Sequence, residues 1–142
     1  MTILTRVPLL VLPVLLYNAC GLLGVDLSAT WFTLQWGAGD GIRVAAEHVC
    51  LMLAIVLLNV EVAKATSVRG GAIAEHVWSL LLALAVLVEL IVVPFAQTVT
   101  FGLLWLSCVS DVASGIVVSI VSARRDMVLG SDVDPSHMTH HR

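Results

Sequence analysis

The sequence predicts an all-α integral membrane bundle of four antiparallel transmembrane helices, with the N- and C-termini in the cytoplasm. The 142-residue chain is 59% hydrophobic and 12% charged, whereas a soluble domain carries about 25% charged residues. Four apolar segments are each long enough to cross about 30 Å of hydrocarbon. These spans lie near 7–25, 44–65, 75–97 and 100–123.

Lysines and arginines set the predicted orientation, because cytoplasmic loops of membrane proteins are enriched in them. Arg6 precedes the first span, Lys64 and Arg69 border the second connection, and Arg124 follows the fourth span. Both termini and the second connection are therefore expected in the cytoplasm. This pattern, with four spans, indicates a multi-pass membrane protein. It also divides the chain into a transmembrane domain, 1–123, and a polar cytoplasmic tail, 124–142.

The first span contains two prolines and lies close to the N-terminus. Pro8 suits a first helical turn, whereas Pro13 is expected to kink the helix. A retained span is the preferred interpretation. The alternative is a cleaved signal peptide, which would leave three spans. The stretch "YNAC" is a poor lipobox, and no clean cleavage site follows a short apolar core.

The first connection is predicted to be a short, tryptophan-rich, strand-like segment on the periplasmic side. Apolar Phe32, Leu34 and Trp36 alternate with polar residues, which is the period of a β-strand. We interpret it as an anchor at the headgroup level, with an outer lid or docking ribbon as the alternative. The predicted interfacial anchors of the whole chain are Trp31, Trp36, Trp78 and Trp105.

The second and third spans each carry the sequence Ala-Glu-His-Val, at 46–49 and 74–77. Each copy is followed by a second glutamate, Glu61 or Glu89, at the same spacing. Ionisable groups inside membrane spans are rare and costly, so a repeated set of them requires an explanation.

The predicted topology relates the two copies by a pseudo-twofold axis. In a helical hairpin that turns near 68–69, His48 lies at the depth of Glu89, and His76 lies at the depth of Glu61. Two cross-helix His–Glu pairs would offset the cost of burying all four groups. We interpret the repeat as coincidence or as a set of polar contacts that hold the helices together. An inverted-repeat transporter and a ligand or cofactor site are the alternatives.

The third and fourth spans each carry an acidic residue near the middle of the membrane. A hairpin that turns near 98–99 places Glu89 and Asp111 at similar depth, where two facing carboxylates would share a proton. They are candidates for proton or cation binding, and the simpler interpretation is a hydrogen-bonded carboxyl that holds helices together. The full candidate proton-binding set is Glu89, Asp111, Glu61, His48 and His76.

The fourth span also carries a stripe of small residues at every fourth position, which favours close helix packing in lipid. This stripe consists of Ser107, Asp111, Gly115 and Ser119.

Neither a metal nor a cofactor is predicted, although two weak metal alternatives exist. Cysteine is also a small hydrophobe that is often buried. His48 and His76 lie near opposite membrane faces, so they cannot ligate one haem. One weak alternative is a zinc-type site of Cys20, Cys50, Cys108 and His48. The other is the tail set of His137, His140 and His141.

The sequence contains no catalytic triad, phosphate-binding loop or basic face, so we predict neither an enzyme nor a nucleic-acid-binding protein. The predicted function is a non-enzymatic accessory or structural subunit of a larger membrane complex, or a homo-oligomer. Its predicted partners are the lipid bilayer and other membrane chains or copies of itself. The alternative is a small proton-coupled transporter or ion channel that uses Glu89, Asp111 and the His–Glu pairs.

Several stretches resemble a family of small four-span proteobacterial inner-membrane proteins, generally labelled hypothetical transmembrane proteins. They are "RVPLLVLPVLLYN", "WFTLQWGAGD", "VEVAKAT" and "FAQTVTFGLLWLSCVSDVASGIVVSIVSARRD". The most specific parts are Val60-Glu61 with Lys64-Ala65-Thr66, and Asp111-Val112 with the segment 123–126. The resemblance extends over nearly the whole chain. It implies a bacterial inner membrane and four spans, and it implies no activity.

Overall fold

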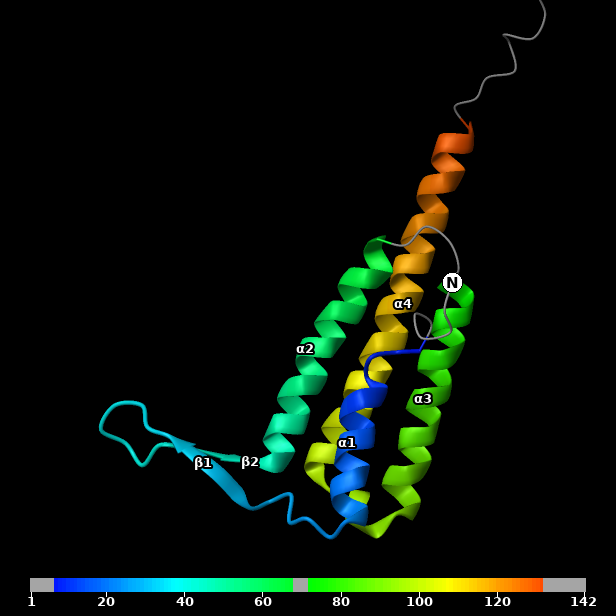
Figure 1. The fold of residues 1–142 in the computed structure, drawn as a ribbon. Coiled ribbons are helices and arrows are strands. Elements are labelled where there is room, and N and C mark those ends of the chain that lie inside the picture. The colour runs from blue at the N-terminus through cyan, green and yellow to red at the C-terminus, as the bar shows by residue number, and fades with distance from the viewer. Residues whose placement is uncertain (1–6, 68–71, 132–142) are drawn as a thin grey trace, which may run out of the picture.

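The structure is a computed structural model that describes residues 7–67 and 72–131, and this part of the chain is mostly helical. Successive helices run in opposite directions, and a small β-hairpin stands to one side of them (Figure 1). The elements in chain order are α1 (Val11–Leu22), β1 (Thr30–Leu34), β2 (Ile42–Ala45), α2 (Ala46–Ser67), α3 (Ala72–Val92), a 3-10 turn η2 (Pro94–Ala96) and α4 (Val99–Ser131).

Helix α4 is the centre of the bundle. Both α2 and α3 pack along it, and α1 lies mainly against α2 with smaller contacts to α4 and η2. Helices α2 and α3 make little direct contact with each other. The two helices that carry the Ala-Glu-His-Val copies are therefore separated by α4.

The core lies where α1, α2, α3 and α4 converge, towards the end of the bundle that carries the hairpin. An aromatic contact in this core joins Tyr17 and Phe101, whose ring centroids lie 5.0 Å apart. Small residues such as Ala54 and Ala83 belong to the same buried cluster and let the helices approach closely. The buried cluster comprises Leu10, Val14, Tyr17, Cys50, Ala54, Ala83, Val86, Ala96, Phe101, Leu104 and Cys108.

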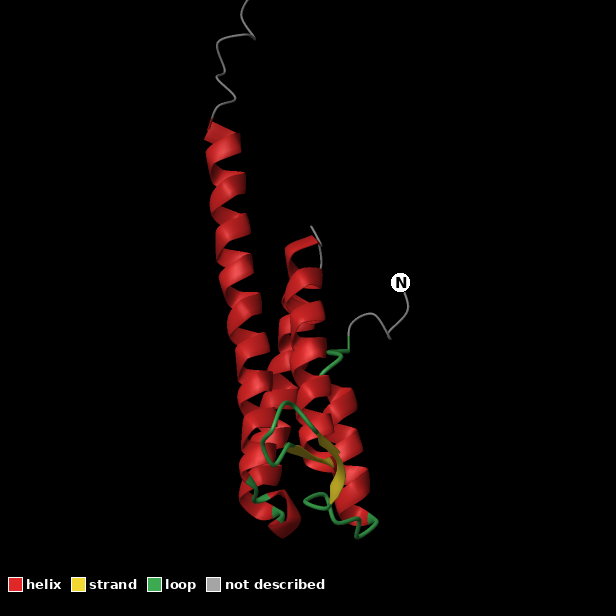
Figure 2. Ribbon diagram, turned by 90° about the vertical axis from the view of Figure 1, so that its left-hand side faces the viewer, coloured by secondary structure: helices red, strands yellow, loops and turns green. Residues whose placement is uncertain are grey.

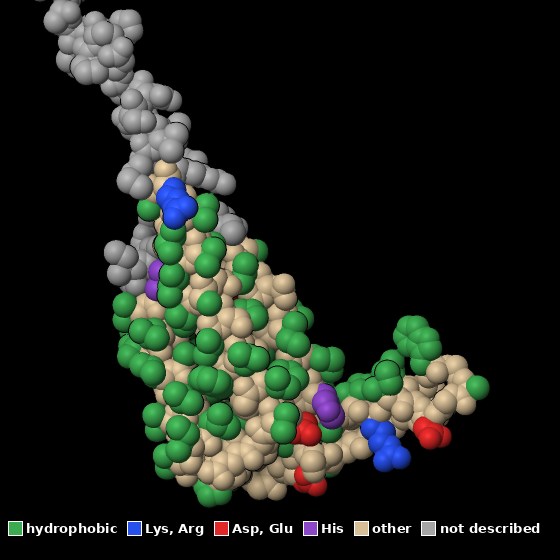
Figure 3. Space-filling view, turned by 180° about the vertical axis from the view of Figure 1, so that it is seen from behind, with side chains coloured by type: hydrophobic (Ala, Val, Ile, Leu, Met, Phe, Trp, Pro, Cys, Tyr) green, Lys and Arg blue, Asp and Glu red, His purple; other side chains and the backbone are tan. Residues whose placement is uncertain are grey.

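The outside of the bundle is apolar along most of its length. Figure 3 shows hydrophobic side chains over this surface, with charged side chains near the two ends and on the hairpin. Residues 46–65 of α2 and 99–124 of α4 are long and apolar enough to cross a membrane, whereas residues 11–22 and 76–92 form shorter apolar helices. The prediction of a helical chain with membrane-type segments is confirmed at this level.

The start of α1 differs from the prediction. The helix begins at Val11, after a tight turn in which the amides of Val11 and Leu12 donate to the carbonyls of Pro8 and Leu9. Pro13 therefore lies in the first turn, where its missing N–H would have had no helical partner. The kink expected at Pro13 has no structural cause here, and the helix is shorter than the predicted 7–25.

The strand predicted in the first connection is confirmed, and it forms half of a hairpin. Strand β1 pairs with β2 in antiparallel register, with Phe32 opposite Val44 and Leu34 opposite Ile42. Gly41 has a positive φ of 76° and lies against Thr33 and Leu34. The hairpin projects sideways from the bundle, and every residue of β1 is exposed (Figures 1 and 2).

The fourth helix begins and ends beyond its predicted limits. Thr98 caps its N-terminus, because the Phe101 amide donates to the Thr98 hydroxyl over 3.1 Å. The helix then continues to Ser131, through the first part of the segment predicted as a polar tail. Figure 2 shows α4 extending well past the other helices.

Candidate functional site

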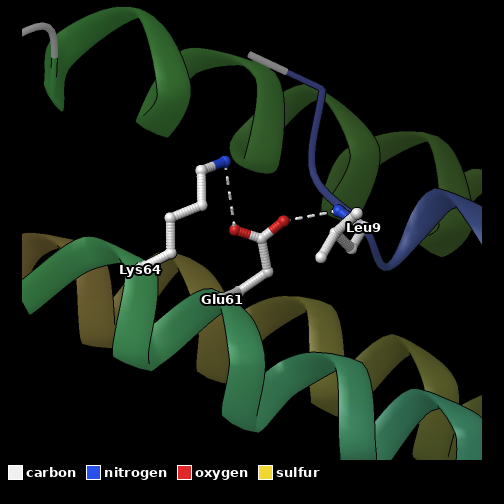
Figure 4. Close-up of polar contacts among 3 residues, drawn as sticks. All are labelled: Leu9, Glu61 and Lys64. Carbon is white, nitrogen blue, oxygen red and sulfur yellow. Dashed lines mark hydrogen bonds and ion pairs between the residues drawn. The ribbon is translucent and has the colours of Figure 1, made fainter. Parts of the chain in front are cut away.

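Glu61 fastens the start of α1 to α2 (Figure 4). Its carboxylate accepts a 2.5 Å hydrogen bond from the Leu9 amide through Oε1, and Oε2 lies 3.6 Å from the Lys64 ammonium. The Glu61 side chain is buried although it is acidic. Two partners reduce the cost of that burial, since an isolated carboxylate in an apolar environment is strongly disfavoured.

Glu61 lies beside the start of α1, where the sequence is apolar and offers no capping side chain. The first amides of a helix have no partner within the helix, and a capping side chain usually supplies one. The capping position of α1 is Leu10, which makes no side-chain hydrogen bond. The Val11 and Leu12 amides bond to the preceding carbonyls, and the Glu61 carboxylate accepts from the Leu9 amide, one residue before the capping position. A negative charge is favoured near a helix start.

A second set of polar contacts joins the helix starts at the opposite end of the bundle. The Thr100 hydroxyl donates to the Glu47 carboxylate over 2.8 Å, and these residues lie in the first turns of α4 and α2. The hydroxyl groups of Tyr17 and Thr98 lie 2.7 Å apart and connect α1 to the cap of α4. None of these four residues was predicted as a site residue, although a threonine just before an apolar run, as at Thr98, is an N-cap signal.

The two histidines of the repeat have different partners. His48 is exposed, and its Nδ1 accepts a 3.0 Å hydrogen bond from the Ala45 amide just before α2. His76 is partly buried, and its Nε2 lies 2.8 Å from the Ser119 hydroxyl on α4. A Cβ at Gly115 would lie 2.3 Å from the His76 ring, so only glycine leaves room for it. Gly115 and Ser119, two members of the predicted small-residue stripe, therefore contact the His76 ring.

The predicted His–Glu pairs are not formed among the described residues. His76 contacts Ser119 in place of Glu61, and His48 contacts its own chain in place of Glu89. The predicted depth of Glu61 and His76 agrees with the structure. Glu47 contacts Thr100, so Glu61, further along a helix parallel to α4, is level with residue 114, and the His76 ring lies beside Gly115. The prediction is wrong about lateral position, since α4 lies between α2 and α3.

Glu89 and Asp111 do not lie at the same depth. Helix α3 ends at Val92, so Glu89 lies one turn from that end, whereas Asp111 lies about 18 Å into α4 at 1.5 Å per residue. Both side chains are half-buried, and neither has a hydrogen bond or ion pair within residues 7–67 and 72–131. The shared-proton pair predicted from a turn at 98–99 is therefore wrong, because residues 93–98 form a longer connection.

The remaining members of the stripe and the predicted anchors occupy varied positions. The Ser107 hydroxyl donates to the Leu103 carbonyl of its own helix over 2.9 Å. Trp31, Trp36 and Trp78 are exposed. Trp105 packs partly against the core.

The cysteines do not assemble into a metal site. Cys50 and Cys108 are buried, Cys20 is partly buried, and all three are free thiols. Within the described ranges, no three histidine, cysteine or acidic side chains lie close enough to hold a metal ion. The weak candidate set of these cysteines with His48 is therefore not brought together. The tail histidines, 137 and 140–141, lie outside the described residues.

A groove of about 330 Å³ runs along the surface between α3 and α4. Its lining is apolar except for His76 and Ser119, which meet at its edge. Comparisons of the chain with protein-family models, curated proteins and solved structures find no match.

Proposed function

We propose that the chain is a four-span inner-membrane protein that acts as a non-enzymatic structural or accessory subunit, in a larger membrane complex or a homo-oligomer. The hairpin carries this proposal. Trp31, Phe32, Trp36 and Ile42 are large apolar residues, and each is at least 47% exposed on an arm that projects from the bundle. A lone two-stranded hairpin is marginally stable in water, so this arm is best explained by a second surface that covers it.

The distribution of charge supports a membrane position. Charged side chains are sparse along the bundle and gather near its ends (Figure 3). Lys64 and Arg124 lie towards the end opposite the hairpin, which favours a cytoplasmic location for that end and a periplasmic location for the hairpin. The resemblance to small proteobacterial membrane proteins supports the same placement.

The polar contacts support a structural role. Glu61, Glu47 and His76 each connect one helix to another segment, and each contact gives a partner to a polar group that is costly to place in a membrane. These three contacts hold the bundle together. A helix-stabilising role accounts for their positions without invoking transport or catalysis.

Site-specific photo-crosslinking in native membranes tests the subunit proposal. A photoreactive residue at position 36, on the arm, should form protein adducts of defined mass with another chain or a second copy. A matched probe at Trp78, which is exposed on α3, controls for random collisions. If both positions give only lipid adducts, the arm is an interfacial anchor and the subunit proposal fails.

A second candidate function is proton-coupled transport or ion conduction. It is favoured by Glu89 and Asp111, two half-buried acids without a partner in the described part of the chain. Reconstituted protein should then carry protons across liposome membranes, and Glu89→Gln or Asp111→Asn should abolish the flux. A flux equal to that of empty vesicles under several ion gradients would exclude this function.

A further inference from the structure

We propose that the groove between α3 and α4 binds one anionic phospholipid from the leaflet at the Lys/Arg-rich end of the bundle. This inference rests on the membrane placement proposed above. The groove is lined by Val77 and Leu80 on α3 and by Val112, Ile116 and Ile120 on α4. These are aliphatic side chains without hydrogen-bonding groups, which suits a hydrocarbon tail.

The length of the groove matches one leaflet. From Val112 to Ile120 the lining extends about 12 Å at 1.5 Å per helical residue. Half of the hydrocarbon core of a bilayer is about 15 Å thick. An acyl chain along the groove would therefore end near the middle of the membrane, and its headgroup would lie beyond Ile120.

The headgroup end of the groove carries complementary charge. Arg124 is exposed and lies one turn beyond Ile120 on the same helix. His76 and Ser119 meet at the same end, so the polar groups of the site gather where a phosphate would lie. A guanidinium binds phosphate oxygens with paired hydrogen bonds, so an anionic headgroup is preferred to a neutral one.

The same features disfavour a helix from a second copy as the occupant. A packed helix would cover the groove and bring an apolar surface close to Arg124. Burying an unpaired guanidinium is costly, whereas a lipid phosphate supplies the missing charge. A lipid tail is also narrow, so about two turns of α3 and two turns of α4 are enough to cover it on both sides.

Native mass spectrometry of the full chain tests the proposal. The purified protein is equilibrated in micelles with equal amounts of phosphatidylglycerol and phosphatidylcholine, and the retained lipids are counted. Arg124→Gln should lower the preference for phosphatidylglycerol about fivefold, the size expected for one basic residue near an anionic headgroup. Arg43→Gln, an exposed arginine on β2, should leave the preference unchanged.

A second pair of variants tests the groove itself. Ile116→Trp should fill the groove and remove the retained lipid, whereas Val117→Trp, at an exposed position outside the lining, should not. Equal lipid retention by these two variants, or an unchanged preference in Arg124→Gln, overturns the proposal. Loss of a dimer in Ile116→Trp with lipid retention unchanged would identify a second copy as the occupant.

Flotation with liposomes separates this inference from the proposed function. The unmodified protein should float with vesicles of phosphatidylglycerol and phosphatidylcholine and resist extraction at high pH. If it does not float, the membrane placement itself is wrong. If it floats but retains both lipids equally, only the groove proposal fails.

Discussion

Glu61 and Glu89 occupy equivalent places in two copies of one sequence pattern, and the structure uses them differently. Glu61 is buried on α2 and contacts the Leu9 amide and Lys64. Glu89 is half-buried on α3, and none of the described residues donates to it. The first carboxylate accepts a backbone amide from the turn that leads into α1, and the second has no such contact within the described chain. A motif therefore fixes where an acid lies along a helix, and the neighbouring elements decide what the acid does.

Alanine substitution of the two glutamates should separate them most clearly. Glu61→Ala should lower the free energy of unfolding by about 1.5–3 kcal/mol, because the Leu9 amide loses a charged acceptor. Glu89→Ala should change it by less than about 0.5 kcal/mol, as expected where no contact is lost. Both values are measurable by reversible unfolding in mixed detergent micelles, followed by circular dichroism.

A third variant separates the hydrogen bond from the ion pair. Glu61→Gln keeps a carbonyl oxygen for the Leu9 amide and removes the attraction to Lys64. Its loss of stability should be clearly smaller than that of Glu61→Ala, because partly exposed ion pairs contribute little. Equal losses for Glu61→Ala and Glu89→Ala would show that the contact with α1 does not stabilise the bundle.

Substitutions at two glycines of α4 test how closely this helix packs against His76, in the second Ala-Glu-His-Val copy. Gly115→Ala should lower the free energy of unfolding by about 1–3 kcal/mol, because the new Cβ would overlap the His76 ring. Gly102→Ala meets open space and should be neutral or stabilising by up to about 1 kcal/mol through helix propensity. The same unfolding measurement applies. A neutral Gly115→Ala would mean that the His76 ring moves aside at no cost.

The hydroxyl partners of the two copies provide a smaller test. Thr100→Val should cost about 1.5 kcal/mol, since it removes a donor from the Glu47 carboxylate. Ser119→Ala should cost about 1 kcal/mol, because it removes a neutral partner of His76. Nuclear magnetic resonance of a ring-labelled protein would show the His76 signals shift in Ser119→Ala and stay in place in Thr100→Val.

The smallest effect concerns an acid outside the helices. The Ser28 hydroxyl and amide both donate to Asp26, and these bonds hold the pKa of Asp26 below its ordinary value of 3.8. The bonds therefore stabilise the fold above that value, and their contribution is lost as the pH falls through the lowered pKa. Ser28→Ala should raise the pKa of Asp26 in a carboxyl titration. An unchanged titration would show that the turn is open in solution.

Residue counting predicted the relative depth of residues on α2 and α3, and it failed at the lateral order of the helices and at the depth of Asp111 on α4. The equal depths of His76 and Glu61 followed correctly from the position of the turn between their helices. Rotation about each helix axis, and the choice of which helix lies between two others, depend on packing of the whole core. The ring contact between Tyr17 on α1 and Phe101 on α4 depends on such packing, and no local sequence pattern predicts it.

Turn chemistry explains the other differences. Proline at position 94 ended α3 earlier than its apolar run suggested, and Thr98 began α4 with a cap. This lengthened the connection and moved Glu89 away from the depth of Asp111. By contrast, the alternation around Phe32 was a purely local signal, and it correctly predicted a strand.

The unbroken length of α4 has a mechanical consequence. A helix fixes both the distance and the angular direction of whatever it carries, and its end at Ser131 lies roughly 10 Å past Arg124. Inserting one residue in this extension would turn its end by about 100°, whereas inserting a full turn would nearly restore the direction. The extension therefore sets both the distance and the angular direction of its end. A series of insertions can show which of the two is important for function.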